Sequence, residues 1–235
     1  MTVLDNPLWP ALVGPQRGFA EVHGLAARYL SDVSPFYALA DTADPQAWAD
    51  AAVLAEPGEA IFVPHGPRTA PPGWEMTFRG EAVQFVGNDV DPGDHPEPIV
   101  LTTADVPEMI DLVRRTDPGP FLSRTIELGR YVGIRRRGAL VAMAGERMRP
   151  SGWSEISAVC TDPAYRGQGL ASGLVGSVIA AIDARGEVPF LHVKGDHPEA
   201  IGLYHKMGFT ERKRCIFGIY RPIGQPWNAA ASAGR

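Results

Sequence analysis

The stretch of sequence that decides the fold is Ser154-Glu-Ile-Ser-Ala-Val-Cys-Thr-Asp-Pro-Ala-Tyr-Arg-Gly-Gln-Gly-Leu-Ala171. It predicts a strand that ends near Thr161, where Pro163 blocks further pairing, and a helix that begins by Gly169. The two glycines let backbone N–H groups converge on one point, because no Cβ obstructs them. The first N–H groups of a helix lack intrahelical acceptors and lie at its positive end. Together with the cation of Arg166 they predict a site for phosphate oxygens; the alternative is an ordinary tight turn.

Two other kinds of phosphate loop do not fit this stretch. A Walker loop needs Gly-Lys-Ser/Thr, and the three lysines, Lys194, Lys206 and Lys213, all lie elsewhere. A dinucleotide loop needs a third glycine where Ser172 stands, and an acid after the next strand, where Val193 and Lys194 stand. A nicotinamide-dependent oxidoreductase is therefore the least favoured of the functions considered.

The second half of the chain predicts strands that alternate with helices. Strands are expected at residues 99–101, 129–135, 139–145, 153–161, 188–193 and 215–220. A helix capped by Thr103 or Asp105, with Glu108 as its capping-box partner, is expected after the first strand. Two further helices are expected at residues 169–185 and 198–207. The pattern indicates an α/β or α+β sheet covered by helices.

The first half of the chain is rich in proline and glycine. Residues 17–32 and 45–56 are predicted to be helices, and residues 75–87 a strand or hairpin. Proline and glycine at residues 91–98 predict a linker. The chain is therefore divided into an accessory region at 1–97, a main domain at 98–222 and a tail at 223–235.

Composition limits the possible partners and location. Hydrophobic residues make up 45% and charged residues 21%, as in average soluble proteins, and no apolar run is long enough for a membrane. The N-terminus MTVLDNPLWP lacks the features of a signal peptide, which predicts a cytoplasmic protein. Cys160 and Cys215 show no ligand spacing, so we expect buried thiols and no metal.

Residues 1–97 hold 14 acids and 4 bases, whereas residues 98–235 hold 13 acids and 18 bases. The basic half suits an anionic ligand, but its scattered bases do not indicate nucleic acid.

Two motifs together resemble a known family. The pattern Asp162-Pro-x-Tyr-Arg-Gly-x-Gly-x-Ala171 resembles the acetyl-CoA-binding motif of the GNAT N-acetyltransferase superfamily. The segment Ala200-Ile-Gly-Leu-Tyr-His-Lys-Met-Gly-Phe209 looks like a second element of that family, at its usual distance. The resemblance covers roughly residues 98–222, and residues 120–126 look like the branch of glycine N-acyltransferase-like proteins. It implies a mixed, mostly antiparallel central sheet with flanking helices, preceded by a smaller α/β region.

The resemblance also implies a co-substrate, acetyl-CoA or another short acyl-CoA, and no metal. In such folds the strand before the loop splays from the next strand, and the pantetheine arm fills the gap. Backbone groups of Val159, Cys160 and Thr161 would then bind the acyl carbonyl and the pantetheine amides. The N–H of Val159 would also stabilise an oxyanion. His197 stands where many relatives have an asparagine that helps to hold the pantetheine. The cofactor phosphates would be held by Arg166, Gly167, Gln168, Gly169, Leu170, Ala171 and Ser172.

Tyr204 and Glu155 are the candidate catalytic residues. Tyr204 matches the family's tyrosine that commonly protonates the departing thiolate; the alternative is a ring packed under the sheet. Glu155 matches a glutamate that serves as general base in some members; the alternative is a surface glutamate. It lies four residues before Val159, so the period of a strand predicts that the two side chains share a face. Glu146 and Arg124 are further candidates for the acceptor cleft, or are surface residues.

The predicted function is the transfer of an acetyl or another short acyl group from CoA to a primary amine. The amine would attack directly in a ternary complex, and the acceptor would be a small-molecule amine or a peptide N-terminus. The alternative is a catalytically inactive acyl-CoA sensor or interaction module. Residues 1–97 would be a degenerate acyltransferase-like half that completes the acceptor cleft, or an oligomerisation module of a homodimer.

Overall fold

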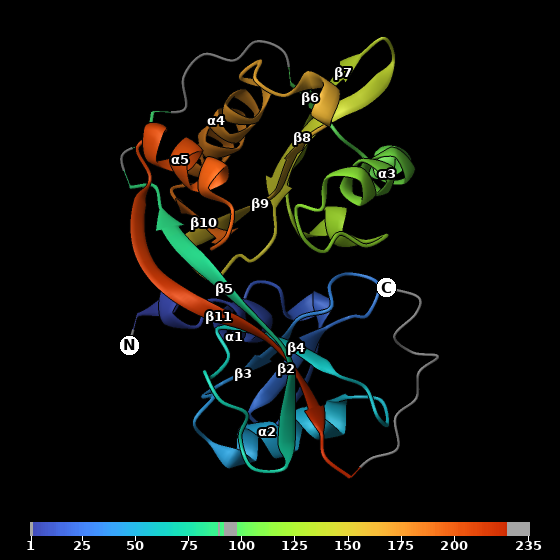
Figure 1. Cartoon of the computed structure of the whole chain (residues 1–235), viewed down its shortest axis with the longest axis vertical. Helices are drawn as coiled ribbons and strands as arrows, with labels where there is room; N and C mark the ends of the chain where they lie inside the picture. Colours follow the sequence, from blue (N-terminus) through green and yellow to red (C-terminus); the bar gives the residue numbers. More distant parts are fainter. Residues whose placement is uncertain (1, 89, 92–97, 225–235) are drawn as a thin grey trace.

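The computed structural model describes residues 2–88, 90–91 and 98–224, and two sheets organise them (Figure 1). The small sheet has the order β1-β2-β3, with bounds Ala20–His23, Ala26–Tyr29 and Tyr37–Leu39. The large sheet has the order β4-β11-β5-β10-β9-β8-β7-β6. The bounds of its strands, in that order, are Ile61–Pro64, Thr210–Pro222, Trp74–Val86, Val188–Lys194, Trp153–Thr161, Ala139–Glu146, Tyr131–Arg136 and Ile99–Val100.

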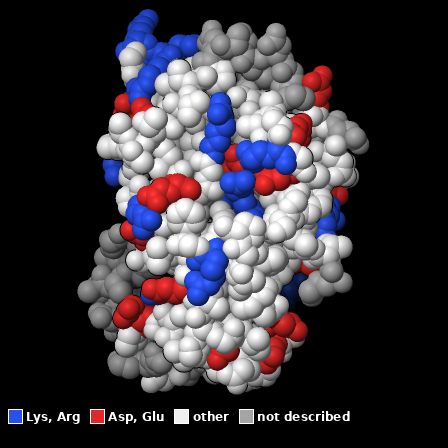
Figure 2. All heavy atoms as spheres, turned by 180° about the vertical axis from the view of Figure 1, so that it is seen from behind, with Lys and Arg blue, Asp and Glu red and all other residues white. Residues whose placement is uncertain are grey.

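The α-helices of the described chain are α1 (Leu8–Val13), α2 (Pro45–Leu54), α3 (Val106–Thr116), α4 (Leu170–Asp183) and α5 (Pro198–Lys206). Short 3-10 helices occur at Val3–Asp5, Arg17–Phe19, Thr103–Asp105, Thr125–Leu128 and Pro163–Tyr165. Within the described ranges, no helix reaches both the length and the apolar character that a bilayer crossing demands. On the face shown in Figure 2, basic and acidic side chains lie among one another.

The large sheet is mostly antiparallel, which confirms the expected fold class. Only β9 and β10 run parallel among its paired strands. Strands β5 and β11 pair along almost their whole length and extend from one half of the molecule to the other (Figure 1). Strands β4 and β5 come from residues 1–97, so this region and residues 98–222 share one sheet. The division at residues 97 and 98 stays a prediction, and the linker and tail lie mostly outside the described residues.

Helices cover both faces of strands β7 to β9. Val132 on β7 lies in the same hydrophobic cluster as Leu174 and Val178 of α4. Its neighbour Tyr131 lies in a different cluster, with Met109 and Leu112 of α3. Because successive side chains of a strand point to opposite faces, α3 and α4 lie on opposite sides of the sheet. In Figure 1 α4 and α5 lie together, and α3 lies apart from them.

The predicted helix at residues 17–32 is wrong. This segment forms a 3-10 turn and then the hairpin of β1 and β2, in which Ala20 pairs with Tyr29 and His23 with Ala26. Gly24 has a φ of 52°, in the left-handed region that a turn needs and a helix does not allow. The helix predicted at residues 45–56 is confirmed as α2, where the Asp44 side chain accepts from the Gln46 N–H at 2.8 Å.

Of the two predicted caps, Asp105 is confirmed as the N-cap residue of α3, but the predicted capping-box partner is wrong. A capping box is made one turn earlier, at the 3-10 helix Thr103–Asp105, where the Asp105 carboxylate accepts from the Thr102 N–H at 2.8 Å. Glu108 does not take part in it, because Glu108 makes two hydrogen bonds of 2.8 and 2.9 Å with Arg135. The other strands and helices predicted beyond residue 99 are confirmed with shifts at their ends. The strand or hairpin predicted at residues 75–87 is a single strand, β5 (Trp74–Val86).

Candidate active site

Strands β9 and β10 separate beside the predicted phosphate loop. Their parallel pairing runs from Trp153 opposite Val188 to Ile156 opposite Leu191, although both strands continue further. Ala158 on β9 has a φ of 53°, and the pairing with β8 shifts register at this point. A residue with positive φ within a strand marks a bulge, which bends the strand and redirects its side chains. The splay that the family resemblance implied is therefore present.

The loop after β9 has the backbone geometry of an anion site. The Asp162 side chain accepts from the Ala164 N–H at 2.9 Å and closes the first turn. Gly167 and Gly169 have φ of 75° and 74°, a region that side chains with a Cβ rarely adopt. Gly169 is the N-cap of α4, a helix of 14 residues, so first-turn N–H groups of α4 are free to meet a ligand. Arg166 is exposed, and its Nε donates to the Thr161 carbonyl at 3.3 Å.

A cavity of about 580 Å³ lies between this loop, the splayed strands and α5. The candidate Tyr204 lines this cavity, which we call the loop cavity. Gln168 and Glu155 do not line it. The predicted cofactor-binding residues that do line it are Val159, Cys160, Thr161, Arg166, Gly167, Gly169, Leu170, Ala171, Ser172 and His197.

Tyr204 is buried at the wall of the loop cavity. Its ring lies 5.6 Å from that of Phe209 and 6.1 Å from that of Phe85, measured between centroids. Burial raises the pKa of Tyr204, so the phenol keeps its proton and is available as a donor. Burial likewise raises the pKa of Cys160 to about 11, so this thiol is not an activated nucleophile.

The structure places Glu155 away from the loop cavity. Ile156 and Val159 belong to the cluster beneath α4, whereas Ala158 and Cys160 belong to the cluster beneath α3. The bulge at Ala158 thus reverses the alternation of faces within β9. The prediction that Glu155 and Val159 share a face is wrong for this reason.

Glu155 is fully buried in an ion pair. Its two carboxylate oxygens accept from Nε and Nη2 of Arg147, both at 2.8 Å. Burial alone would raise the pKa of Glu155, but Arg147 and a hydrogen bond with His192 outweigh it and lower the pKa to about 2. The group is therefore a permanent carboxylate near neutral pH.

His192 is the main candidate residue that the sequence alone did not single out. Its Nδ1 lies 2.8 Å from the Glu155 carboxylate, which can only accept, so Nδ1 carries a proton. Its Nε2 lies 2.8 Å from His65 Nε2 and 3.1 Å from Gln84 Nε2. The Gln84 amide is oriented by Arg212 and by the Leu4 carbonyl, so its nitrogen faces His192. A neutral His192 thus accepts at Nε2.

His65 shares the proton network. Burial, and then the proximity of His192, lower the pKa of His65, so His65 is neutral and donates to His192. Its Nδ1 is buried and has no hydrogen-bond partner within residues 2–88, 90–91 and 98–224. His65, His192 and Cys215 are also a group among the described residues that could hold a metal ion, with donor atoms within 4.8 Å of one another. The hydrogen bonds of His192 are satisfied by Glu155, His65 and Gln84.

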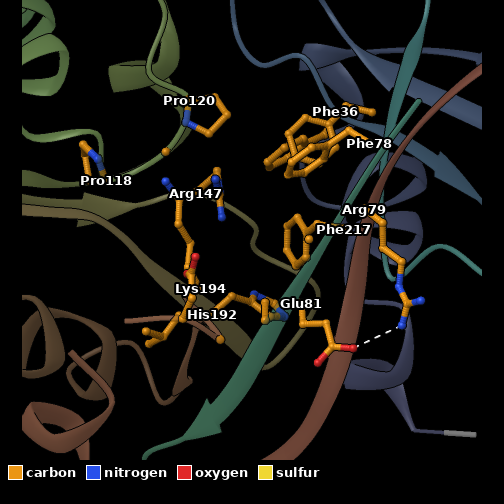
Figure 3. A pocket seen from close by; sticks show the side chains of 17 residues that line it. Phe36, Phe78, Arg79, Glu81, Pro118, Pro120, Arg147, His192, Lys194 and Phe217 are labelled. Carbon is orange, nitrogen blue, oxygen red and sulfur yellow. Dashed lines mark hydrogen bonds and ion pairs between the residues drawn. The ribbon is translucent and has the colours of Figure 1, made fainter. Parts of the chain in front are cut away.

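A second cavity, of about 620 Å³, adjoins the first (Figure 3). We call it the phenylalanine pocket, because Phe36, Phe62, Phe78 and Phe217 line it. The loop of Pro118, Gly119 and Pro120 forms the opposite wall, as Figure 3 shows. Residues that line both cavities are Pro118, Arg147, His192, Val193 and Lys194. The two cavities therefore share part of their lining, and His192 is the histidine among the shared residues.

Two further candidates from the sequence lie elsewhere. Glu146 is fully buried and binds Arg185, with Oε2 and Nη2 2.5 Å apart. Arg124 pairs with Glu127 at 2.8 Å on the surface. Neither lines either cavity. The signal for His192 was weak, because a single histidine in an apolar strand is common in cores.

Comparisons with known proteins agree with the fold and with the family resemblance. A family model described as FR47-like protein matches residues 131–217. The N-alpha-acetyltransferase RimI of Mycobacterium tuberculosis is 34% identical to this chain over 120 residues. The match covers 46% of this chain and 75% of RimI. A solved structure from Novosphingobium aromaticivorans, described as a GNAT-family acetyltransferase, has a TM-score of 0.86 and 37% identity, and the match covers 94% of this chain and 99% of that one. A GCN5-related N-acetyltransferase from Kribbella flavida shares the fold, with a TM-score of 0.60 at 16% identity over 95% of this chain and 98% of that one.

Proposed function

The chain belongs to the GNAT acetyltransferase family, and we propose that it transfers an acetyl or another short acyl group from CoA to a primary amine. One observation supports this proposal above the others. The loop cavity has the glycine turn and helix N-terminus that suit a diphosphate, and it shares lining residues, His192 among them, with a second cavity that can hold an acceptor. The assignment to the glycine N-acyltransferase-like branch and the cytoplasmic location stay predictions.

In the proposed complex, the phosphates of acyl-CoA bind Arg166 and the N–H groups around Gly167 and Gly169. The pantetheine arm lies in the gap between β9 and β10, near Val159 and His197. Gln168 would act only through its backbone, since its side chain does not line the loop cavity. No metal takes part in this proposal.

The proposed reaction is direct attack in a ternary complex. The amine nitrogen bonds to the thioester carbonyl carbon, and the carbon–sulfur bond breaks. One proton leaves the attacking nitrogen for Nε2 of His192, which must first lose the hydrogen bond from His65, and the departing thiolate takes the phenolic proton of Tyr204. Both residues later exchange protons with water, so the products are an amide and free CoA.

We propose that Glu155 acts through His192 rather than on the amine. A carboxylate with a pKa of about 2 is a weak base, but it fixes the Nδ1 proton of His192 and stabilises the imidazolium, as the aspartate of a Ser-His-Asp triad does. When His192 gains a proton at Nε2, His65 must release its own Nε2 proton to water and take one up from water at Nδ1, so that a lone pair of His65 faces His192.

The test has two stages. Acetyl-CoA binding is measured by calorimetry on the parent and on Arg166→Glu, and thiol release is then followed with a panel of primary amines. We expect binding that Arg166→Glu weakens at least tenfold, and release that depends on the amine. Binding without release for any amine would favour the alternative function, an inactive acyl-CoA sensor. The absence of binding would overturn both.

A further inference from the structure

The phenylalanine pocket is built from parts of the chain that are distant in sequence. Phe36 precedes β3, Phe62 lies on β4, Phe78 on β5 and Phe217 on β11. The rings of Phe36 and Phe62 meet edge to face, with centroids 4.8 Å apart. The Phe217 ring lies 6.2 Å from Phe36 and 6.0 Å from Phe62. These contacts hold an aromatic wall in place before any ligand arrives.

The aromatic wall lies on the acceptor side of His192. Phe36, Phe62 and Phe217 line the phenylalanine pocket and not the loop cavity. The His192 ring lies 5.5 Å from the Phe217 ring, measured between centroids. An amine within reach of His192 would therefore place its substituent against these rings.

The charges of the pocket argue against an acceptor with several ammonium groups. The charged residues that line it are three bases and two acids, Arg79, Arg147, Lys194, Glu81 and Asp196. Glu81 accepts from Arg79 at 3.1 Å, as Figure 3 shows, and Arg147 is held by Glu155. The Arg147 guanidinium also lies 4.7 Å from the centroid of Phe36, so that ring face already meets a cation. A polyamine or an aminosugar would meet no excess of carboxylates here.

We propose that the acceptor is a monoamine whose amino group is joined to an aromatic or large aliphatic group, which the phenylalanine pocket binds. This inference rests on the proposed function and names its substrate class. The amine is presented either by a free small molecule or by the first residue of a peptide, and both share this chemistry. A hydrophobic pocket discriminates by about 10–200-fold for each missing methylene group, so the preference is measurable.

The experiment compares amines within two arms, alkylamines and peptide α-amines, at saturating acetyl-CoA. Thiol release is measured with 2-phenylethylamine, ethylamine and spermidine, and with Phe-Gly amide and Ala-Gly amide as the peptide arm. We expect kcat/KM for 2-phenylethylamine to exceed that for ethylamine by at least 100-fold, and spermidine to be the poorest. Equal or better turnover of ethylamine or spermidine would overturn the inference while leaving the acyltransferase reaction intact. A preference confined to the peptide arm would identify a peptide as the source of the amine.

Variants connect the preference to the pocket. Phe78 is 51% exposed, so Phe78→Ala should fold, and Phe62→Leu keeps an apolar side chain in the wall. Both should raise KM for 2-phenylethylamine at least tenfold and leave acetyl-CoA affinity unchanged. The matched control is Val53→Ala, an exposed apolar residue of α2 that lines neither cavity. An effect of Val53→Ala equal to that of the pocket variants would contradict the inference.

Failure of the acceptor class and failure of the reaction can be told apart. If no amine is turned over, binding of 2-phenylethylamine to the CoA-loaded protein is measured by calorimetry. Binding that Phe78→Ala weakens would support the pocket as a site for such amines even in an inactive protein. No detectable binding of 2-phenylethylamine would overturn the inference.

Discussion

The Glu155 carboxylate lies 2.8 Å from Nδ1 of His192, a residue that lines both the loop cavity and the phenylalanine pocket. Glu155 comes from β9 and His192 from β10, and Phe190, two residues before His192, pairs with Glu155 in the parallel register. The pairing that ends at Leu191 thus places the histidine beside the carboxylate and at the start of the splay. Arg147 completes the arrangement by neutralising the carboxylate.

Removing the Glu155 charge should be costly. Glu155→Gln leaves the Arg147 guanidinium buried without a counter-ion, and breaking one partner of such a pair typically costs roughly 3–5 kcal/mol. Urea unfolding followed by circular dichroism measures the change. The control is Glu127→Gln, which breaks an exposed pair with Arg124 and should change the unfolding free energy far less, because solvent screens the two charges. Equal losses in the two variants would contradict the assignment of a buried pair.

The stability that Glu155 confers should depend on pH. Its pKa in the folded protein is about 2, below the ordinary value of 4.5, so the folded state binds this proton less readily than the unfolded chain does. The difference in unfolding free energy between the parent and Glu155→Gln should be fully present above pH 4.5. It should shrink as the pH falls toward 2. Denaturant unfolding at several pH values checks this, and a constant difference would count against it.

Replacing Tyr204 by phenylalanine should slow the reaction without loosening the cofactor. Loss of a general acid typically costs about 10²–10⁴-fold in rate, and the phenol is not needed to hold the phosphates. Thiol release gives kcat, and calorimetry gives the acetyl-CoA affinity. Tyr165→Phe is the matched control, because Tyr165 lines the same cavity and has no assigned proton transfer. If Tyr204→Phe retains full kcat, Tyr204 is not the acid.

The role of His192 should depend on the basicity of the acceptor. A lysine-like amine is almost fully protonated at pH 7, and freeing it costs roughly 4–5 kcal/mol, whereas an α-amine costs about 1 kcal/mol. His192→Gln should therefore lower kcat/KM by roughly 10²–10⁴-fold for a strongly basic amine and much less for a weakly basic one. His205→Gln, an exposed histidine of α5 outside both cavities, is the control. A uniform loss for all amines would indicate that His192 is only structural.

Substitution of two glycines at opposite ends of α4 distinguishes the effect of backbone strain on stability from an effect on acetyl-CoA binding. Gly169 and Gly186 have φ of 74° and 70°, so leucine at either position should cost about 1–2 kcal/mol of stability. Gly169 lines the loop cavity and Gly186 does not. We expect Gly169→Leu to reduce acetyl-CoA affinity more than tenfold and Gly186→Leu to leave it unchanged. Calorimetry measures the acetyl-CoA affinity of both variants, and thermal unfolding measures their stability. Equal losses of affinity in the two variants would contradict the prediction.

The linear sequence determined the local features of this protein. The turn at Gly167 and Gly169, the helix that follows and the strand at residues 153–161 depend on residues that are neighbours in the chain, and proline and glycine restrict the backbone directly. The two motifs between residues 162 and 209 likewise indicated the family and the loop cavity. Rules that depend only on neighbouring residues therefore sufficed to predict most helices and strands of the second half of the chain.

Only the tertiary structure decided which side chains meet at the candidate acceptor side. The bulge at Ala158 places Glu155 and Val159 on opposite faces of the sheet. The residue types of the strand give no sign that the alternation of its side chains between the two faces is interrupted there. His192 gains its candidate role from a carboxylate 37 positions earlier in the chain and a histidine 127 positions earlier. The phenylalanine wall joins four strand regions in the same way. Long-range pairing of β5 and β11 brings these groups together, because burial in a shared sheet, and not the local chain, fixes their neighbours.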